Sequence, residues 1–156
     1  MKTNAARLLD RLAIEYQILT YPVDPHNLVA SSTADKLGLP PEQVFKTLVV
    51  RGDLKGVCLA VLAANAHLNL KSLAQLTQDR KILPVPLKEV QPLTGYIRGG
   101  VTALACKKNY PTYVDEWIEA HDYIAVSAGM RGAMLWLTPQ DYLKATQATV
   151  GALGLS

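Results

Sequence analysis

Short blocks of apolar residues run along the chain, and their spacing changes between that of a helix and that of a strand. Residues 5–12 carry apolar side chains at helical spacing, which predicts an amphipathic helix ending near Ala13. The run EYQILTYP that follows predicts a strand closed by Pro22. The chain is therefore expected to begin with a helix and an extended segment.

The next segment, SSTADKLGLPPEQ, predicts a short helix and then a second helical turn. Ser31 or Ser32 is expected as the N-cap and Gly38 as the stop, with a restart at Pro40-Pro41.

A β-hairpin is predicted by TLVVRGDLKGVCLAVLAA, in which two apolar runs flank a glycine-bearing turn. Lys46, in VFKTLVV, stands where the preceding helical turn becomes the first strand of this hairpin. Cys58 lies in the second apolar run and is expected to be a buried strand residue.

The rest of the chain predicts two short helical segments, four strands and a final helix. Asn69 is expected to cap a helix in NLKSLAQL, and PLKEVQPLTG predicts a further helical turn. Thr138 and Pro139 provide the cap and first position of a last helix that runs to about Ala148. The predicted strands are YIRGGVTAL, TYVDE, YIAVSAG and AMLWL.

Strands and helices interleave without a steady βαβ rhythm, which favours an α/β (mixed α+β) fold with a central mixed sheet flanked by helices. The 156 residues are 49% hydrophobic, so one domain over 1–156 with its own core is expected. The net charge is only +3, so charge alone does not predict a nucleic-acid partner. A localised contact with RNA stays open if basic residues cluster. No long apolar stretch or secretory leader pattern is present, so a cytoplasmic location without membrane contact is expected.

Lys46 is the charged residue that most needs an explanation, because lysine is seldom buried without a partner. One interpretation is a side chain whose stem covers apolar surface while its ammonium reaches solvent. The other is a cation at a cleft that holds a phosphate or a developing oxyanion. The pattern alone leaves both interpretations open.

Two glycine-rich segments, GYIRGG over 95–100 and SAGMRG over 127–132, are further candidates. Glycines at strand ends let a ligand approach main-chain N–H groups, which could bind a phosphate or an oxyanion. Both segments could equally be ordinary turns. Neither matches a P-loop or a dinucleotide fingerprint, so a nucleotide cofactor is disfavoured.

Metal and cysteine chemistry are also disfavoured by the spacing of the relevant residues. His26, His67 and His121 have no metal-ligand spacing, and no cofactor of any kind is expected. Cys106 precedes two lysines that could lower its pKa, but no base accompanies it.

Taken in order, YQILTYP, LGLPPEQVFKTLVV, LNLKSLA, TGYIRGGV, IAVSAGMRG and LTPQDYLKAT resemble the YbaK-type editing proteins nearly from end to end. That family is similar to the inserted editing domain of bacterial prolyl-tRNA synthetases, and the YbaK type is the Cys-tRNA(Pro) deacylase. The resemblance implies the same fold and a hydrolase that removes a wrong amino acid from tRNA in trans.

The resemblance also implies roles for particular residues. Lys46 matches the family's essential lysine in the pocket for the aminoacylated 3′ end of tRNA, and the substrate's own thiol attacks its ester, so no protein nucleophile is needed. The catalytic set expected on this basis is Lys46, Gly99 and Gly100, with main-chain N–H groups near Gly99, Gly100 and Gly129 as oxyanion donors. The expected substrate-binding residues are Tyr21, Thr47, Thr102, Ser127, Gly129 and Arg131.

One departure concerns the amino acid that is removed. Family members commonly read Gly-Gly-x-Ser-Pro, whereas this chain has Thr102-Ala103 in place of Ser-Pro. Removal of alanine or another small residue with water as nucleophile therefore remains an alternative. A second alternative is a non-catalytic module that holds a tRNA end or a nucleotide-like ligand in the same cleft. The expected partners are the aminoacylated tRNA 3′ end, met mainly as a single strand, and prolyl-tRNA synthetase, with no role for DNA.

Overall fold

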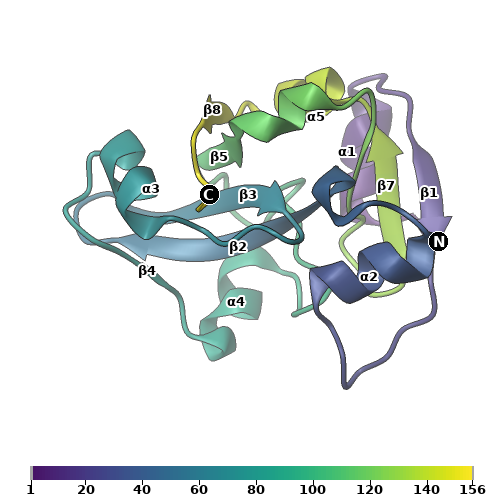
Figure 1. The fold of residues 1–156 in the computed structure, drawn as a ribbon, viewed down its shortest axis with the longest axis horizontal. Coiled ribbons are helices and arrows are strands. Elements are labelled where there is room, and N and C mark those ends of the chain that lie inside the picture. The colour runs from purple at the N-terminus through teal and green to yellow at the C-terminus, as the bar shows by residue number, and fades with distance from the viewer. Residues whose placement is uncertain (1, 156) are drawn as a thin grey trace.

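The computed structural model describes residues 2–155, which form one eight-stranded mixed sheet with helices packed around it (Figure 1). The helical elements are α1 (Asn4–Arg11), α2 (Ala30–Leu37), η1 (Pro41–Gln43), α3 (Leu70–Thr77), α4 (Leu87–Thr94), η2 (Glu116–Ala120) and α5 (Pro139–Thr146). The strands are β1 (Gln17–Thr20), β2 (Val44–Gly52), β3 (Gly56–Ala63), β4 (Ile82–Pro84), β5 (Thr112–Asp115), β6 (Ile124–Ser127), β7 (Ala133–Leu137) and β8 (Thr149–Gly151).

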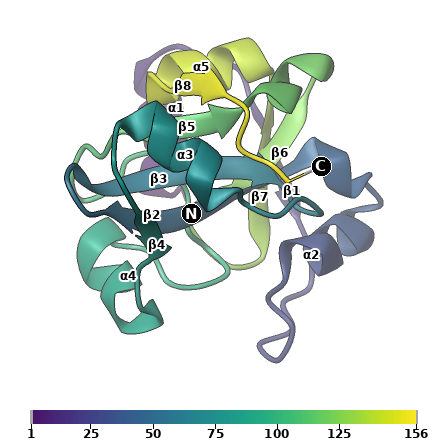
Figure 2. The same cartoon turned by 60° about the vertical axis from the view of Figure 1, so that its left-hand side comes forward.

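The strand order is β1-β7-β6-β2-β3-β5-β8, and β4 pairs with β2 off this path. Strand β2 is parallel to β6, and β3, β5 and β8 are parallel to one another, while the remaining pairs are antiparallel. Figures 1 and 2 show β7 and β1 turned steeply against the long β2–β3 pair. The predicted mixed α/β architecture is confirmed.

The predicted hairpin is confirmed, with β2 and β3 paired in register from Phe45↔Ala63 to Gly52↔Gly56. Asp79, which follows α3, fixes the turn between them. Its carboxylate accepts hydrogen bonds from the main-chain N–H groups of Leu54 (2.9 Å) and Lys55 (2.7 Å). A distant helix end therefore holds the hairpin turn in place.

Most of the predicted helix ends are confirmed. Asn69 and Thr138 cap α3 and α5 through their side-chain oxygens, and Gly38 ends α2 in the left-handed conformation. The serine cap of α2 was wrong, because the helix begins earlier, at Ala30. Val29 is the N-cap and makes no side-chain cap hydrogen bond, so both serines lie inside the first turn.

The strand predicted in YIRGGVTAL is also wrong, since residues 95–105 form an irregular loop. Gly99 has φ +87°, and the N–H of Gly100 donates to Ile97 O at 2.9 Å, which closes a turn where a strand would have to continue. The Tyr96 hydroxyl then donates to Leu104 O at 2.6 Å and holds the far end of the loop. Strands β4 and β8 were not predicted.

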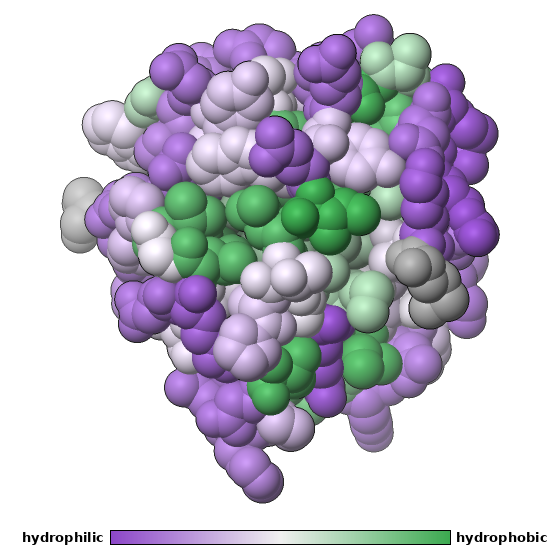
Figure 3. Space-filling model, turned by 90° about the vertical axis from the view of Figure 1, so that its right-hand side faces the viewer, coloured by the Kyte–Doolittle hydropathy of each residue, from purple (hydrophilic) through white to green (hydrophobic). Residues whose placement is uncertain are grey.

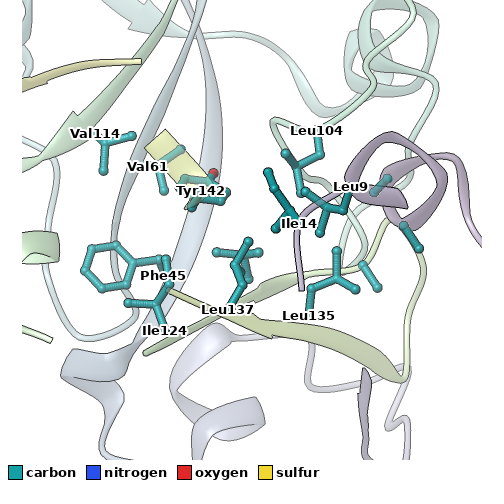
Figure 4. Close-up of a cluster of buried hydrophobic side chains, with 14 of the residues drawn as sticks. Leu9, Ile14, Phe45, Val61, Leu104, Val114, Ile124, Leu135, Leu137 and Tyr142 are labelled. Atoms are coloured by element: carbon teal, nitrogen blue, oxygen red, sulfur yellow. The ribbon is translucent and has the colours of Figure 1, made fainter. Parts of the chain in front are cut away.

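The largest group of buried side chains lies between the sheet, α1 and α5 (Figure 4). Phe45 of β2, Val61 of β3 and Tyr142 of α5 meet there, and Leu9 of α1 packs with them. This core fixes the buried face of β2. On the outside, Figure 3 shows apolar side chains in groups within a largely polar surface on the side of β1 and α2. No helix within 2–155 is long and apolar enough to span a membrane.

One edge of β2 is shared by two short strands that do not meet. Strand β6 pairs with Val44 and Phe45, and β4 pairs with residues 50–52. Among residues 2–155, no strand pairs with residues 46–49 on this edge. The gap lies at the centre of the candidate site.

Candidate functional site

A cleft of roughly 580 Å³ opens along the gap in the β2 edge. Its floor is residues 44–50 of β2, and its walls come from the segment before and within α2, from the β4–α4 region, and from loop residues 98–101. Ser127 and Met134, from β6 and β7, close one end. The lining is predominantly apolar, as is typical of small-molecule sites.

Lys46 is the charged residue on the floor of this cleft. Its ammonium donates to Ala66 O at 2.6 Å and to Ala64 O at 3.1 Å, in the turn that follows β3. Two of its three N–H bonds are thereby held, and one is left to meet a ligand. Of the two interpretations open from the sequence, the structure supports a cation at a cleft.

Burial lowers the pKa of the Lys46 ammonium from its ordinary value of 10.5. The side chain is partly buried, and within the described part of the chain it has no carboxylate partner. Removing an ammonium from water disfavours its charged form, and here only two carbonyl oxygens compensate. An unpaired cation of this kind in a cleft is a candidate functional group.

Five of the predicted site residues line the cleft together: Tyr21, Lys46, Thr47, Gly99 and Ser127. They come from the end of β1, from β2, from the 95–105 loop and from the end of β6. Segments far apart in the sequence therefore meet because β6 and β2 are adjacent strands and the loop is bonded to the segment after β6, where Arg131 Nε donates to Arg98 O.

The other four predicted residues lie behind or beside the cleft. Thr102 is fully buried, and its hydroxyl faces Leu104 N (3.4 Å), so Val101 lines the cleft in its place. Gly100 is buried against the main chain of Met130. Neither Thr102 nor Gly100 lines the cleft.

Gly129 acts as a packing position for the cleft wall. Its φ is +91°, and a Cβ there would lie 2.8 Å from the ring of Tyr96. Because the Tyr96 hydroxyl also holds the 95–105 loop, this glycine lets the two glycine-rich segments pack together.

The predicted oxyanion donors differ in whether their N–H groups are free. Gly100 N–H donates to Ile97 O, and Gly129 N–H donates to the Ser127 hydroxyl at 3.1 Å. Gly99 N–H has no acceptor among residues 2–155. Of these three, Gly99 is the one whose donor is available to a ligand.

Arginine side chains gather at the mouth of the cleft. Arg98 lines it, and its carbonyl accepts a hydrogen bond from Arg131 Nε at 2.8 Å. Arg131 itself lies in a small adjoining hollow with Lys36 and Tyr21. Arg98 was missed from the sequence because it reads as a strand residue there, although its place in GYIRGG was a signal. These cations suit a phosphate at the entrance.

Neither cysteine offers a reactive thiolate. Burial raises the pKa of Cys106 to about 11, against the lowering that Lys107 and Lys108 suggested, and its thiol donates to Thr102 O at 3.2 Å. Burial likewise raises the pKa of Cys58 to about 11, and the nearby Asp79 charge adds to it. Thiols with such pKa values are protonated at neutral pH.

The cleft also lacks the groups that ordinarily activate water. Over residues 2–155, no aspartate, glutamate or histidine lines it, and no cluster of metal-binding side chains is present. What it provides is one ammonium, the hydroxyl-bearing residues Tyr21, Thr47 and Ser127 in its lining, and the free main-chain N–H of Gly99. Such a site can position a substrate and stabilise charge, and the nucleophile must come from elsewhere.

Known proteins resemble this chain in sequence and in fold. The family model of the aminoacyl-tRNA editing domain matches residues 25–145. A protein of Enterococcus faecalis, provisionally named Cys-tRNA(Pro)/Cys-tRNA(Cys) deacylase EbsC, is 37% identical over 93% of this chain and 88% of its own length.

Two solved structures share the fold at 24% sequence identity. One is described as a provisional trans-editing enzyme for prolyl-tRNA synthetase and has a TM-score of 0.85 over 100% of this chain and 99% of its own. The other, a hypothetical protein, has a TM-score of 0.89 over 98% and 100%. The resemblance drawn from the sequence motifs is confirmed: the chain belongs to the family of aminoacyl-tRNA editing domains.

Proposed function

We propose that this protein is a trans-acting deacylase that hydrolyses mischarged tRNA(Pro), with Cys-tRNA(Pro) as its main substrate. The observation that carries the proposal is Lys46, an unpaired and partly buried ammonium in an apolar cleft without a carboxylate or imidazole among the described lining residues. The name of the Enterococcus relative and the family match support the same reaction.

The absence of a protein base along the described cleft favours a nucleophile supplied by the substrate. The cysteinyl sulfur attacks the carbonyl carbon of its own ester and forms a four-membered thiolactone through a tetrahedral intermediate. The carbon–oxygen bond to the ribose then breaks. The proton lost by the thiol is balanced by the proton gained by the ribose hydroxyl, and water later opens the thiolactone to free cysteine.

In this reaction the protein supplies position and charge. The third N–H of Lys46 faces negative charge that develops on the oxygens of the reacting ester, and Gly99 N–H is a second available donor. The arginines at the mouth, Arg98 and Arg131, are placed to hold the phosphate that precedes the terminal adenosine.

Prolyl-tRNA synthetase is proposed as a partner that selects the tRNA. The chain has a net charge of only +3, and Arg131 and Lys36 line the small hollow beside the cleft, so little grip on the tRNA body is expected. The relative's name pairs Cys-tRNA(Pro) with Cys-tRNA(Cys), which fits a site that reads the aminoacyl end.

The proposed function is tested by single-turnover hydrolysis of Cys-tRNA(Pro) and Ala-tRNA(Pro) by wild type, Lys46→Ala and a control, Lys55→Ala, whose side chain is exposed in the hairpin turn. Wild type and the control should remove cysteine, and Lys46→Ala should be slower by about 10² to 10³, as for the loss of an oxyanion donor.

Removal of alanine at a comparable rate would show instead that the protein is a deacylase in which water, not a substrate thiol, is the nucleophile. A folded Lys46→Ala protein with the wild-type rate would overturn the role of Lys46. If wild type binds charged tRNA and hydrolyses neither ester, the chain is a binding module.

A further inference from the structure

The gap in the β2 edge leaves main-chain groups without partners at the floor of the cleft. In an antiparallel ladder, alternate residues direct both their N–H and C=O to the same neighbour. Val49 O accepts from Val85 N at 3.1 Å across this edge, so the odd-numbered residues of β2 face the cleft side.

Thr47 is the odd-numbered residue in the middle of the gap. The β6 pairing ends at Phe45, opposite Val126, and the β4 pairing begins at Val50, opposite Pro84. The N–H and C=O of Thr47 therefore both point into the cleft without a partner in the part of the chain that the structure describes. Unpaired main-chain groups on a strand edge are a ready template for another extended segment.

We infer that the main chain of Thr47 binds the aminoacyl group as if it were one residue of an added antiparallel strand. This inference rests on the proposed function. The Thr47 C=O accepts from the substrate's α-ammonium, and the Thr47 N–H donates to the oxygen of the ester carbonyl. An aminoacyl ester carries these two groups on either side of one Cα, as a strand residue does.

The length of the gap matches a single residue. A hydrogen-bonded antiparallel pair exchanges both of its bonds between two facing residues. Thr47 is the one residue in the gap whose N–H and C=O both face the cleft with no partner among the described residues. A longer peptide would meet β6 on one side and β4 on the other. The gap thus suits an amino acid linked to a ribose better than a protein segment.

This pairing also places the substrate side chain. Facing residues of a sheet direct their side chains to the same face, so the bound side chain lies on the face of Thr47 and Val49. There Val49 packs with Val85, and Val90 and Val101 adjoin them. The side chain of Lys46 lies on the opposite face, so the apolar pocket and the cation flank the ester from two sides.

The Thr47 N–H is then an oxyanion donor that acts at the same carbonyl throughout the reaction. As the carbonyl carbon becomes tetrahedral, negative charge grows on the oxygen that this N–H already binds. Side-chain substitutions at position 47 leave this donor unchanged. The role of the Thr47 N–H can therefore be tested only by changing the main chain itself.

The test replaces residue 47 with the α-hydroxy acid analogue of threonine, which exchanges the N–H for an ester oxygen. The matched control is the same replacement at Thr20 on the outer edge of β1. Thr20 is exposed, and Tyr21 N–H donates to Gly132 O just before β7, so the neighbouring Thr20 N–H points away from the sheet. Each replacement also turns the carbonyl of the preceding residue into an ester carbonyl, which is a weaker hydrogen-bond acceptor. The thermal unfolding midpoints of both variants are therefore compared, to show that both are folded.

With Cys-tRNA(Pro) in single turnover, the replacement at 47 should slow hydrolysis by about 10²-fold and the control by less than about twofold. A second arm measures binding of 3′-alanylamino-adenosine and of its propionyl counterpart, which lacks only the ammonium. The propionyl compound should bind at least about tenfold more weakly to wild type.

An unchanged rate for a folded replacement at 47, or equal binding of the two adenosine compounds, overturns the inference while wild type remains a deacylase. Loss of hydrolysis in wild type itself overturns the proposed function, and the binding arm still decides whether the ammonium is recognised.

Discussion

At the scale of single residues, Lys46 is held between two opposing effects. Burial lowers the pKa of its ammonium, and the carbonyl oxygens of Ala64 and Ala66 compensate in part by accepting hydrogen bonds. The side chain is therefore fixed in position while its charge stays available to a ligand.

We predict that Lys46 titrates below 10.5 in the folded protein. Between its folded and unfolded pKa values the unfolded chain binds more protons, so stability should rise with pH in that window. Below the folded pKa, burial of the charge opposes folding by a constant amount. Titration of ¹³Cε-labelled lysines by NMR measures the midpoint, and Lys46→Met identifies the resonance. A midpoint at or above 10.5 contradicts the prediction.

The sequence could locate part of the site at this scale. Lys46 stood out as a charge in an apolar run, and Ser127 and Gly99 stood out beside glycines. Thr102 and Gly100 are buried instead, because the segment that carries them forms a loop with its own turn. Which atoms of a loop face a cleft depends on hydrogen bonds that spacing does not encode.

At the scale of elements, the β2–β3 hairpin depends on a residue outside it. The Asp79 carboxylate accepts from two turn N–H groups and from the Thr77 hydroxyl at 2.6 Å. Gly52, at the end of β2, lies directly against this carboxylate, and a Cβ there would overlap it. The glycine is required for the close approach.

We expect Gly52→Ala to lower the free energy of unfolding by about 2 kcal/mol or more, because Asp79 must move and its hydrogen bonds are strained. Gly154→Ala is the control, since its nearest neighbour would be 3.8 Å from the new Cβ, and it should change stability by less than about 0.5 kcal/mol. Urea unfolding measures both. Equal effects of the two substitutions would contradict the role given to Gly52.

Element prediction from the sequence succeeded where a local signal was strong. The threonine and asparagine caps and the left-handed Gly38 are local features, and they were found. The strands β4 and β8 were missed because each has three residues and exists through its pairing, with β2 and with β5 respectively. Short strands are defined by partners that the local sequence does not contain.

At the scale of the whole molecule, three basic residues besides Lys46 lie in or beside the cleft, and the net charge of the chain is small. Arg98, Arg131 and Lys36 lie there, whereas the net charge of the chain is +3. Contact with tRNA should therefore involve few phosphates near the 3′ end.

We predict that the protein alone hydrolyses Cys-tRNA(Pro) and Cys-tRNA(Cys) at rates within about tenfold of each other, because few contacts reach the tRNA body. Addition of prolyl-tRNA synthetase should favour Cys-tRNA(Pro). Rates for both substrates with and without the synthetase measure this, and alanyl-tRNA synthetase serves as the control. Strong selectivity without any synthetase would show that the chain reads tRNA identity itself.

The sequence by itself determined the family and the mixed α/β class, and it predicted five of the residues that line the candidate cleft. Its apolar periodicity and its motifs are local features, so they can be recognised without knowing which strands pair. The gap in the β2 edge was decided by the tertiary structure alone. It exists because the pairing of β2 with β6 stops at Phe45 and its pairing with β4 starts only at Val50, a register between distant segments that frees the main chain of Thr47 within the described residues.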